Sequence, residues 1–226
     1  MQKYNIDLKE INIFKKKGYL HIKNFFSEIY LNKISNEIKK NKKIYKSVRI
    51  INAHRTVSIV KKLFKNKQII FTVRKLLKTS AVTGLQSELF INPPYKSKGH
   101  PPHQDDFFLK TGKGNSLNFW IPLVNTNKKN GALIFYENSH KEGIKKKLNN
   151  ILLNSKSANQ ALLKKYKSKT INCRLGDVII ISNSIFHKSN NNMSKKKRPA
   201  IAYGYMKKGS NYVRGKTAKR IPIKVD

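Results

Sequence analysis

A succession of short strand-like runs is the feature that most limits how this sequence can fold. From residue 82 to residue 207, apolar and β-branched residues come in brief blocks, and turn residues such as Gly, Pro and Asn separate many of them. The blocks are 82–91, 117–123, 131–136, 170–174, 177–182 and 198–207. Many short strands in series favour an antiparallel double-sheet barrel, the jelly roll or double-stranded β-helix, over a parallel α/β fold.

The first third of the chain has helical spacing instead. A strand-like run at 18–26 is followed by Ser27, a good helix cap, and then by apolar residues that recur on one side of a helix. Those residues are Ile29, Leu31, Ile34 and Ile38. Segments 58–64 and 68–77 also predict helices. The predicted fold class is therefore mainly β with N-terminal helices, of the α+β kind.

The division of the chain into domains follows from the same patterns. No internal repeat or linker interrupts the sequence, so we expect a single domain over 1–226. Within it, 1–80 is the mostly helical N-terminal part, 81–208 is the jelly-roll core, and 209–226 is a basic tail that we expect to be mobile in part.

The charge of the chain is extreme. Lysine and arginine number 49 against 11 Asp and Glu, which gives a formal net charge of +38. Such an imbalance can indicate nucleic acid, an anionic membrane surface or an acidic substrate. The lysines run from Lys3 to Lys224 without forming a single block, and Asn and Ile are abundant as well. These three residue types share A/T-rich codons, so we interpret the charge as compositional and keep nucleic acid as an alternative partner.

The cysteine content and the hydropathy pattern favour a soluble, reducing compartment. Cys173 is the only cysteine, which excludes an intrachain disulfide and a zinc site built from several thiolates. The first ten residues lack the apolar core of a signal peptide, and runs such as 132–136 are far shorter than a membrane span. We expect a soluble, cytoplasmic protein without membrane insertion, and the oligomeric state stays open.

Three residues from two distant stretches have the chemistry of a metal site. His103 and Asp105 stand two positions apart, and residues i and i+2 of a strand point to the same face. His187 follows a strand-like run 84 positions after His103. Two His and one carboxylate, with other positions open, is the arrangement that non-haem Fe(II) oxygenases use. A jelly roll can bring such distant residues together, whereas a lone His-x-Asp pair is common by chance.

Arg198 and Ser189 complement this candidate site. A 2-oxo acid can chelate such a cation through its carboxylate and keto oxygen, with dioxygen taking the last position. A dicarboxylate cosubstrate also needs an anchor for its far end, and a guanidinium fork is the best carboxylate clamp. Arg198 is well placed for this role because it comes eleven positions after His187, at the start of the next predicted strand. Ser189 can add a hydroxyl donor.

These residues lie in stretches that resemble the phytanoyl-CoA dioxygenase family of Fe(II)/2-oxoglutarate-dependent oxygenases. The resemblance extends over most of the chain and includes FKKKGYLHIKNFF, HQDDFFL, NFWIPL, NGALIFYENSHKEG and LGDVIIIS. Its most specific part is the series His187, Ser189, Asn192, Ser194 and Arg198. The family usually has Gly where this chain has Asn138. Because Asn tolerates the left-handed conformation better than most residues, we expect this turn to form.

The resemblance implies a cupin-like jelly roll and a role for each site residue. It implies three iron ligands, His103, Asp105 and His187. It implies two residues that bind the distal carboxylate of 2-oxoglutarate, Arg198 and Ser189. It also implies three positions that line the cosubstrate or substrate pocket, Gln86, Asn118 and Trp120. Related halogenases have Ala or Gly where Asp105 stands, so the carboxylate favours hydroxylation over halogenation.

The expected activity is hydroxylation of a C–H bond in a small-molecule substrate, using Fe(II), 2-oxoglutarate and O2 and releasing succinate and CO2. The residues do not identify the substrate, although the charge of the chain allows an anionic one. Two alternatives stay open: oxidative demethylation of nucleic acid by the same site, and a non-catalytic jelly-roll binding protein. His54 and the insert 145–167 have no assigned role.

Overall fold

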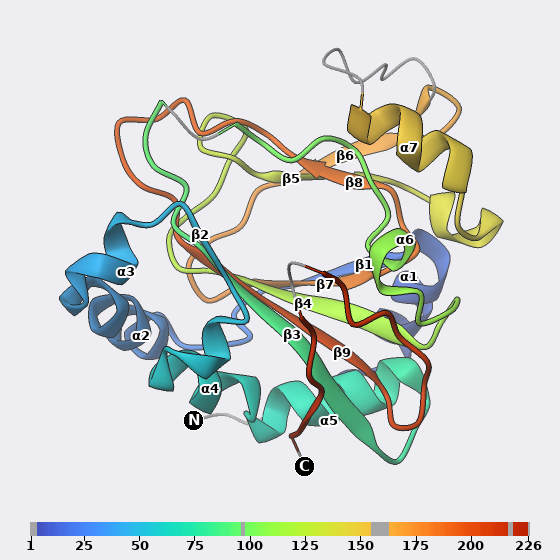
Figure 1. Cartoon of the computed structure of the whole chain (residues 1–226), viewed down its shortest axis with the longest axis horizontal. Coiled ribbons are helices and arrows are strands. Elements are labelled where there is room, and N and C mark those ends of the chain that lie inside the picture. Colours follow the sequence, from blue (N-terminus) through green and yellow to red (C-terminus); the bar gives the residue numbers. More distant parts are fainter. Residues whose placement is uncertain (1–3, 96–97, 155–162, 217–218, 226) are drawn as a thin grey trace.

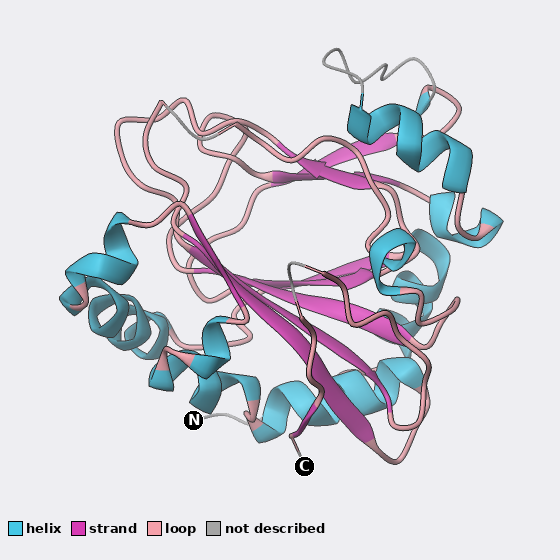
Figure 2. Cartoon of the chain, viewed as in Figure 1, coloured by secondary structure: helices cyan, strands magenta, loops and turns pink. Residues whose placement is uncertain are grey.

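Two antiparallel sheets face each other, and helices cover the outer face of the larger sheet (Figure 1). The computed structural model describes residues 4–95, 98–154, 163–216 and 219–225. Figure 2 shows the helices of the first third gathered on one side of the large sheet, with the small sheet across from its other face. The predicted class, mainly β with N-terminal helices in a jelly roll, is confirmed.

The larger sheet holds seven of the described strands. Their order is β1-β7-β4-β9-β3-β10, and β2 also pairs with β3. All of these pairings are antiparallel. The strands are β1 (Tyr19–Ile22), β2 (Arg49–Ile51), β3 (Val82–Phe90), β4 (Ser116–Pro122), β7 (Val178–Ser182), β9 (Ala200–Lys207) and β10 (Ile223–Lys224).

The smaller sheet contains three strands, in the order β6-β5-β8. They are β5 (Leu133–Tyr136), β6 (Ser168–Ile171) and β8 (His187–Ser189). Strands next to each other in the sequence, such as β4 and β5 or β7 and β8, therefore belong to opposite sheets. The chain passes repeatedly from one sheet to the other, which places segments remote in the sequence on the two walls of one interior space.

The period of two along each strand separates the core from this interior space. On β4, Leu117, Phe119 and Ile121 pack in the hydrophobic core beneath the helices. Asn118 and Trp120, at the alternate positions, face the space between the sheets and line a cavity there. Because successive side chains of a strand point to opposite faces, one strand can supply both core and site.

The helices of the N-terminal third pack on the outer face of the large sheet. They are α1 (Leu8–Lys17), α2 (Glu28–Lys40), α3 (Lys42–Lys46), η1 (Ala53–Arg55), α4 (Ser58–Phe64) and α5 (Lys67–Leu77). Ser27 caps α2 as predicted, since its Oγ accepts a hydrogen bond from the Tyr30 amide at 3.3 Å. Leu31, Ile34 and Ile38 are buried, but Ile29 is 83% exposed, so its predicted place on the apolar face is wrong.

Three further helices lie among the later strands in the described part of the chain: α6 (Asp106–Leu109), η2 (Ser139–Glu142) and α7 (Lys146–Asn154). Asn138, which precedes η2, has φ +67°, so the predicted turn forms in the left-handed conformation. No helix in the described ranges is long and apolar enough to cross a membrane.

The predicted boundaries of the sheet core are too narrow. The large sheet takes β1 and β2 from the part predicted as mostly helical, where β1 lies within the strand-like run at 18–26, and it takes β10 from the segment predicted as a basic tail. Ile223 pairs with Gly84, and Lys224 pairs with Thr83. The tail therefore returns to the edge of the sheet, because β3 has backbone groups there that β10 can satisfy.

Candidate active site

Backbone pairing brings the two distant histidines together. His187 begins β8, and an isolated antiparallel bridge joins it to His103. The N–H of each residue donates to the carbonyl oxygen of the other at 3.0 Å. The centroids of the two imidazole rings are 4.5 Å apart. The structure therefore brings together two side chains that the sequence separates by 84 positions.

Asp105 reaches the same point by a route other than the predicted one. Its backbone is helical, with φ −60° and ψ −37°, and it caps α6, so it does not share a strand face with His103. The turn still directs the carboxylate at both rings. Oδ1 lies 3.3 Å from Nε2 of His103, and Oδ2 lies 3.6 Å from Nε2 of His187. The predicted cluster is present, and the strand periodicity used to predict it is wrong.

The residues on either side of Asp105 hold this turn in place. Gln104 is fully buried, and its side-chain amide donates to the carbonyls of Gly143 and Ser184. Asp106 is also buried, and its carboxylate accepts hydrogen bonds from the Thr111 and Gly112 amides at 2.7 and 3.1 Å. Both side chains therefore fix the loop around α6, and no periodic pattern in the sequence indicates either role.

Hydrogen bonds orient both imidazoles toward the cluster. Nδ1 of His103 lies 2.8 Å from the Pro101 carbonyl oxygen, and Nδ1 of His187 lies 3.2 Å from the Ile185 carbonyl oxygen. A carbonyl oxygen only accepts, so in each ring Nδ1 carries the proton that it donates. In the neutral form of each ring the Nε2 lone pair is then available on the side of Asp105, and this is the tautomer that a metal ligand requires.

The charges of the cluster support one another. Burial by itself would raise the pKa of Asp105, but His187, His103 and the Asn118 amide together hold it well below its usual range. The pKa of His103 is raised despite burial, because Asp105 accepts its hydrogen bond and attracts its charge. Burial lowers the pKa of His187. The carboxylate is therefore ionised at neutral pH and available to a cation.

A cavity of about 330 Å³ between the two sheets contains this cluster and Arg198. Arg198 is 2% exposed, and its Nε is buried without a hydrogen-bond partner among the described residues. Burial lowers its pKa to about 10, so the guanidinium stays charged at neutral pH. A buried cation is costly unless it is paired. The wall of the cavity is therefore suited to bind an anion at Arg198.

The residues around Arg198 leave room for that anion. Its guanidinium carbon lies 5.7 Å from the centroid of the Trp120 ring, in a cation–π position. Gly131 has φ +99°, and a Cβ there would lie 3.2 Å from Nε and Nη2 of Arg198. Ser189 also lines the cavity, and its Oγ accepts the His100 amide at 2.9 Å. The proton of that hydroxyl can then be donated to a ligand.

The three remaining predicted residues all line the cavity, from β3 and β4. Asn118 donates from Nδ2 to Oδ2 of Asp105 at 2.6 Å. Gln86 accepts a hydrogen bond from Arg220 through its Oε1 at 2.7 Å. Gly204 lies between them on β9, where a Cβ would come within 3.0 Å of the Asn118 Oδ1. Asn118 is therefore turned toward the candidate metal ligands, and Gln86 toward Arg220.

Four titratable residues that line the cavity were not predicted from the sequence: Arg49, Glu88, His100 and Arg220. Glu88 was findable in principle, because it stands two positions after Gln86 on the same face of β3. The other three come from a short edge strand, a loop and the C-terminal segment, where no periodicity indicates direction. The ring of His100 lies 6.1 Å from that of His103 by centroids.

His54 and the described part of the insert 145–167, to which the sequence assigned no role, have defined positions in the fold. His54 is buried on the other face of β3, where its Nδ1 lies 2.7 Å from Oγ of Ser87. It is absent from the described lining of the cavity. Within the insert 145–167, α7 contributes Leu153 to that lining, and residues 155–162 lie outside the described part of the chain.

A second group of possible ligands, His21, Cys173 and Asp177, is explained by structural hydrogen bonds. The Asp177 carboxylate accepts from the Asn24 and Arg174 amides at 3.1 and 2.9 Å and contacts Nε2 of His21 at 2.9 Å. Burial raises the pKa of the Cys173 thiol to about 12. A protonated thiol and a fully used carboxylate are poor metal ligands.

Replacing Asn118 with alanine should weaken Fe(II) binding by about 10- to 100-fold, because the Asp105 carboxylate loses the hydrogen bond that orients it. Titration of the apoprotein with Fe(II) under anaerobic conditions measures the effect. Ser116→Ala is a matched control, since Ser116 is a buried residue of the same strand that contacts Thr111 and Asn183 rather than the ligands. Equal affinities in the two variants would contradict the positioning role.

Two facing antiparallel sheets enclose a His/Asp/His cluster and an arginine that has no ion-pair partner among the described residues. This defines a class: double-stranded β-helix proteins with a site suited to non-haem iron. The family model for phytanoyl-CoA dioxygenase (PhyH) matches residues 14–200. The chain belongs to the phytanoyl-CoA dioxygenase family, and thus to the non-haem iron, 2-oxoglutarate-dependent oxygenases. Iron, 2-oxoglutarate and O2 are the cofactor and cosubstrates of that class.

A curated relative agrees with the assignment to the phytanoyl-CoA dioxygenase family. Phytanoyl-CoA dioxygenase 1 of Oryza sativa subsp. japonica is 28% identical over 102 residues, which cover 45% of this chain and 36% of the rice protein. The match thus covers about a third of that relative's length.

Solved structures share the fold. The non-haem α-ketoglutarate-dependent carbocyclase SnoK from nogalamycin biosynthesis has a TM-score of 0.79 at 16% identity, over 93% of this chain and 88% of SnoK. EctD from S. alaskensis, solved with 2-oxoglutarate and 5-hydroxyectoine, has a TM-score of 0.76 at 16% identity, over 94% of this chain and 80% of EctD. At this identity the likeness concerns the fold alone.

Proposed function

We propose that this protein hydroxylates a C–H bond of a small-molecule substrate, with Fe(II) and 2-oxoglutarate bound in the cavity between the sheets and with succinate and CO2 released. The observation that carries the proposal is that one cavity contains both a candidate metal site and a candidate carboxylate-binding site. A His/Asp/His cluster lies on one part of its wall, and on another lies the buried guanidinium of Arg198, for which the described part of the chain supplies no counter-ion.

The residues present fit an iron ion. His103 and His187 each direct Nε2 toward Asp105, and the possible ligand atoms lie within 4.8 Å of one another. Three protein ligands leave positions open for 2-oxoglutarate and O2, as the facial arrangement requires. When bound, iron would supply the activation of O2 and the oxidation of the substrate C–H bond. The carboxylate of Asp105 also fits hydroxylation better than halogenation, because it occupies the position that a halide would need.

The residues present also fit 2-oxoglutarate. Arg198 would bind its distal carboxylate through the guanidinium fork, and the Ser189 hydroxyl would donate to the same group. Apolar side chains from several elements share the lining: Phe108, Leu109, Trp120, Leu133 and Ile181. They would exclude water from the reacting groups, which limits uncoupled oxidation.

The test is succinate formation by the purified protein with Fe(II), ascorbate and 2-oxoglutarate, with and without pools of small metabolites. We expect iron-dependent succinate that rises when a substrate is present, and a product one oxygen atom heavier when labelled dioxygen supplies the atom. Product that is oxidised without gaining oxygen would contradict hydroxylation. Absence of iron-dependent turnover across broad pools would instead favour the non-catalytic binding protein.

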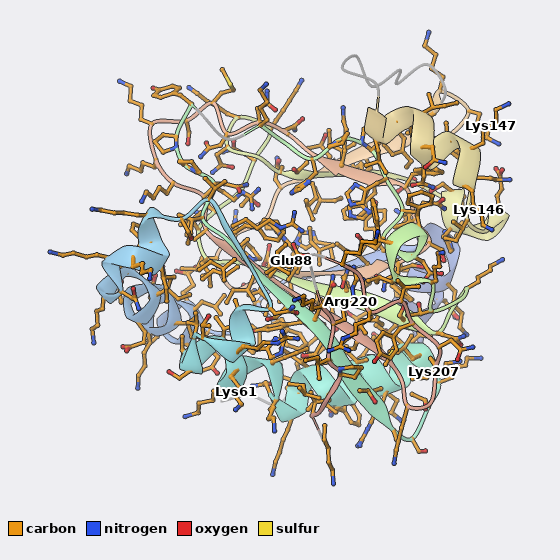
Figure 3. All side chains as sticks on the ribbon, viewed as in Figure 1. Lys61, Glu88, Lys146, Lys147, Lys207 and Arg220 are labelled. Atoms are coloured by element: carbon orange, nitrogen blue, oxygen red, sulfur yellow. The ribbon has the colours of Figure 1, made fainter. Side chains whose placement is uncertain are left out.

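The structure offers no particular reason to prefer nucleic acid as the substrate. The lysines labelled in Figure 3 come from separate elements: Lys61 from α4, Lys146 and Lys147 from α7, and Lys207 from the end of β9. Scattered charge of this kind agrees with the compositional interpretation. Oligonucleotide binding that persists at physiological salt would revive the alternative. A cytoplasmic location stays a prediction from the sequence.

A further inference from the structure

Three guanidinium groups and two carboxylates line the cavity, and they are not evenly paired. The guanidiniums belong to Arg49, Arg198 and Arg220, and the carboxylates belong to Glu88 and Asp105. In Figure 3, Glu88 and Arg220 lie near the middle of the molecule, whereas the labelled lysines lie toward its outside. The partner of each charged group therefore determines which ligand the cavity can accept.

Arg49 and Glu88 form one pair. Nε and Nη2 of Arg49 lie 2.8 and 2.5 Å from the same carboxylate oxygen, Oε2 of Glu88. The other oxygen, Oε1, has a single long contact of 3.5 Å with Nε2 of Gln86. Glu88 is therefore neutralised by Arg49 but keeps one oxygen that can accept a further hydrogen bond.

Arg220 has only neutral partners among the described residues. Its Nε donates to Oε1 of Gln86 at 2.7 Å, and its Nη1 donates to the Val213 carbonyl oxygen at 2.8 Å. These two bonds use Nε and Nη1 and fix the direction of the guanidinium, while Nη2 has no hydrogen-bond partner among the described residues. The residue is 8% exposed, and burial lowers its pKa. Its charge is thus held at the cavity without a direct counter-ion.

The C-terminal segment positions Arg220 specifically. The Arg220 amide donates to the Arg214 carbonyl oxygen at 2.7 Å, and the Val213 amide donates to the Leu109 carbonyl oxygen at 2.8 Å. Beyond Arg220, β10 pairs with β3. The segment is therefore tied both to α6, next to Asp105, and to the large sheet. Ordering a segment near a chain end costs conformational entropy, and the contacts on both sides of Arg220 offset that cost.

The charges that remain after cosubstrate binding point to the substrate. Bound Fe(II) and Arg198 together carry three positive charges, which Asp105 and the two carboxylates of 2-oxoglutarate balance. Arg49 is balanced by Glu88. Arg220 is then the guanidinium of the cavity lining whose only attraction to carboxylates comes from a distance, from Glu88 and Asp105, because it forms no direct ion pair among the described residues. Because a buried charge is stabilised by pairing, the Nη2 end of the Arg220 guanidinium, which has no partner among the described residues, is suited to an anion.

We propose that the primary substrate is a small polar molecule whose carboxylate or phosphate binds Arg220 and whose hydroxyl or amino group donates to Oε1 of Glu88. This proposal rests on the proposed function, because it assigns the substrate of the same cavity. A volume of about 330 Å³, shared with 2-oxoglutarate, limits the substrate to a small molecule. The two contacts would hold one end of it and present the rest to the iron.

The first experiment asks whether the cavity selects for negative charge. The probes are matched sets of hydroxy acids, amino acids and sugar phosphates with their neutral amides or alcohols. Binding is measured anaerobically by the change in the absorption of the Fe(II)–2-oxoglutarate complex. We expect at least one anionic probe to bind about 10- to 100-fold more tightly than its neutral counterpart. Preference for carboxylates or for phosphates distinguishes the two sources of the anion.

The second experiment assigns the preference to Arg220. Arg220→Gln should remove the preference for anionic probes. Arg220→Lys should keep part of this preference, because lysine retains the charge but not the fork. Arg214→Gln is the matched control, since Arg214 is exposed and belongs to the same segment. Glu88→Gln should weaken the binding of amino acids more than the binding of acids that lack an amino group. The melting temperature of each variant reports folding.

The proposal would be overturned by neutral probes that bind as tightly as anions, by failure of every anionic probe to bind, or by an anion preference that survives in Arg220→Gln. These outcomes differ from failure of the proposed function. If the proposed function is wrong, the wild-type protein does not develop the absorption of the Fe(II)–2-oxoglutarate complex even before a probe is added.

Discussion

Replacing His103 and His187 together with alanine should weaken Fe(II) binding by at least about 100-fold. The two imidazoles supply two of the three ligand atoms that the structure brings within 4.8 Å of one another. Loss of residues that only orient ligands already costs about 10- to 100-fold, so loss of two ligands sets that range as a minimum. Anaerobic titration with Fe(II) and metal content after purification measure the effect, and succinate formation should fall with it.

His21→Ala is the informative control for this experiment. His21 belongs to the other group of possible ligands, with Cys173 and Asp177. We expect its replacement to leave Fe(II) affinity unchanged and to affect stability only, because Asp177 loses one of its hydrogen-bond partners. If the double variant keeps the wild-type affinity and His21→Ala loses it, the metal site has been assigned to the wrong cluster.

Replacing Arg198 with glutamine should weaken 2-oxoglutarate binding by about 100-fold and leave Fe(II) affinity unchanged. A hydrogen bond to a charged group contributes more than one between neutral groups, and a guanidinium fork can make two of them. Anaerobic titration of the ferrous protein with 2-oxoglutarate measures the change. Lys196→Gln is the matched control, because Lys196 is exposed and only two positions away.

The pH dependence of the same titration provides a second check. Burial lowers the pKa of Arg198 to about 10, so its guanidinium is protonated below that pH and loses its proton above it. The contribution of Arg198 should therefore be constant near neutral pH and should decline only as the pH approaches 10. A wild-type affinity that is equal to that of Arg198→Gln at pH 7 would contradict the role of the residue.

The sequence was sufficient where local chemistry carries the information. Alternation of apolar residues marked β4 and β9, and Ser27 marked the start of α2, because these signals depend on near neighbours. The residue types of His103, Asp105, His187 and Arg198 indicated a metal and a dicarboxylate, since few side chains offer that set of ligands. Whether these residues meet was a prediction that depended on the jelly-roll topology.

The tertiary structure decided the directions of side chains outside regular elements. Asp105 lies in a helical turn, so the strand rule that led to it fails even though the carboxylate reaches both histidines. Ile29 is exposed because α2, which contacts α3 and α4, buries a narrower face than the spacing implied. In both cases the packing partner, which is remote in the sequence, determines the outcome.

The amino-acid sequence thus determined the chemical groups available to this protein and the periodicity of its strands. Only the tertiary structure decided that Glu88 and Arg220 share a cavity with the metal cluster. The physical reason is that Arg220 reaches the cavity through the pairing of β10 with the edge of β3 and through hydrogen bonds to Val213 and Gln86. Backbone pairing between segments more than a hundred residues apart leaves no periodic trace in either of them.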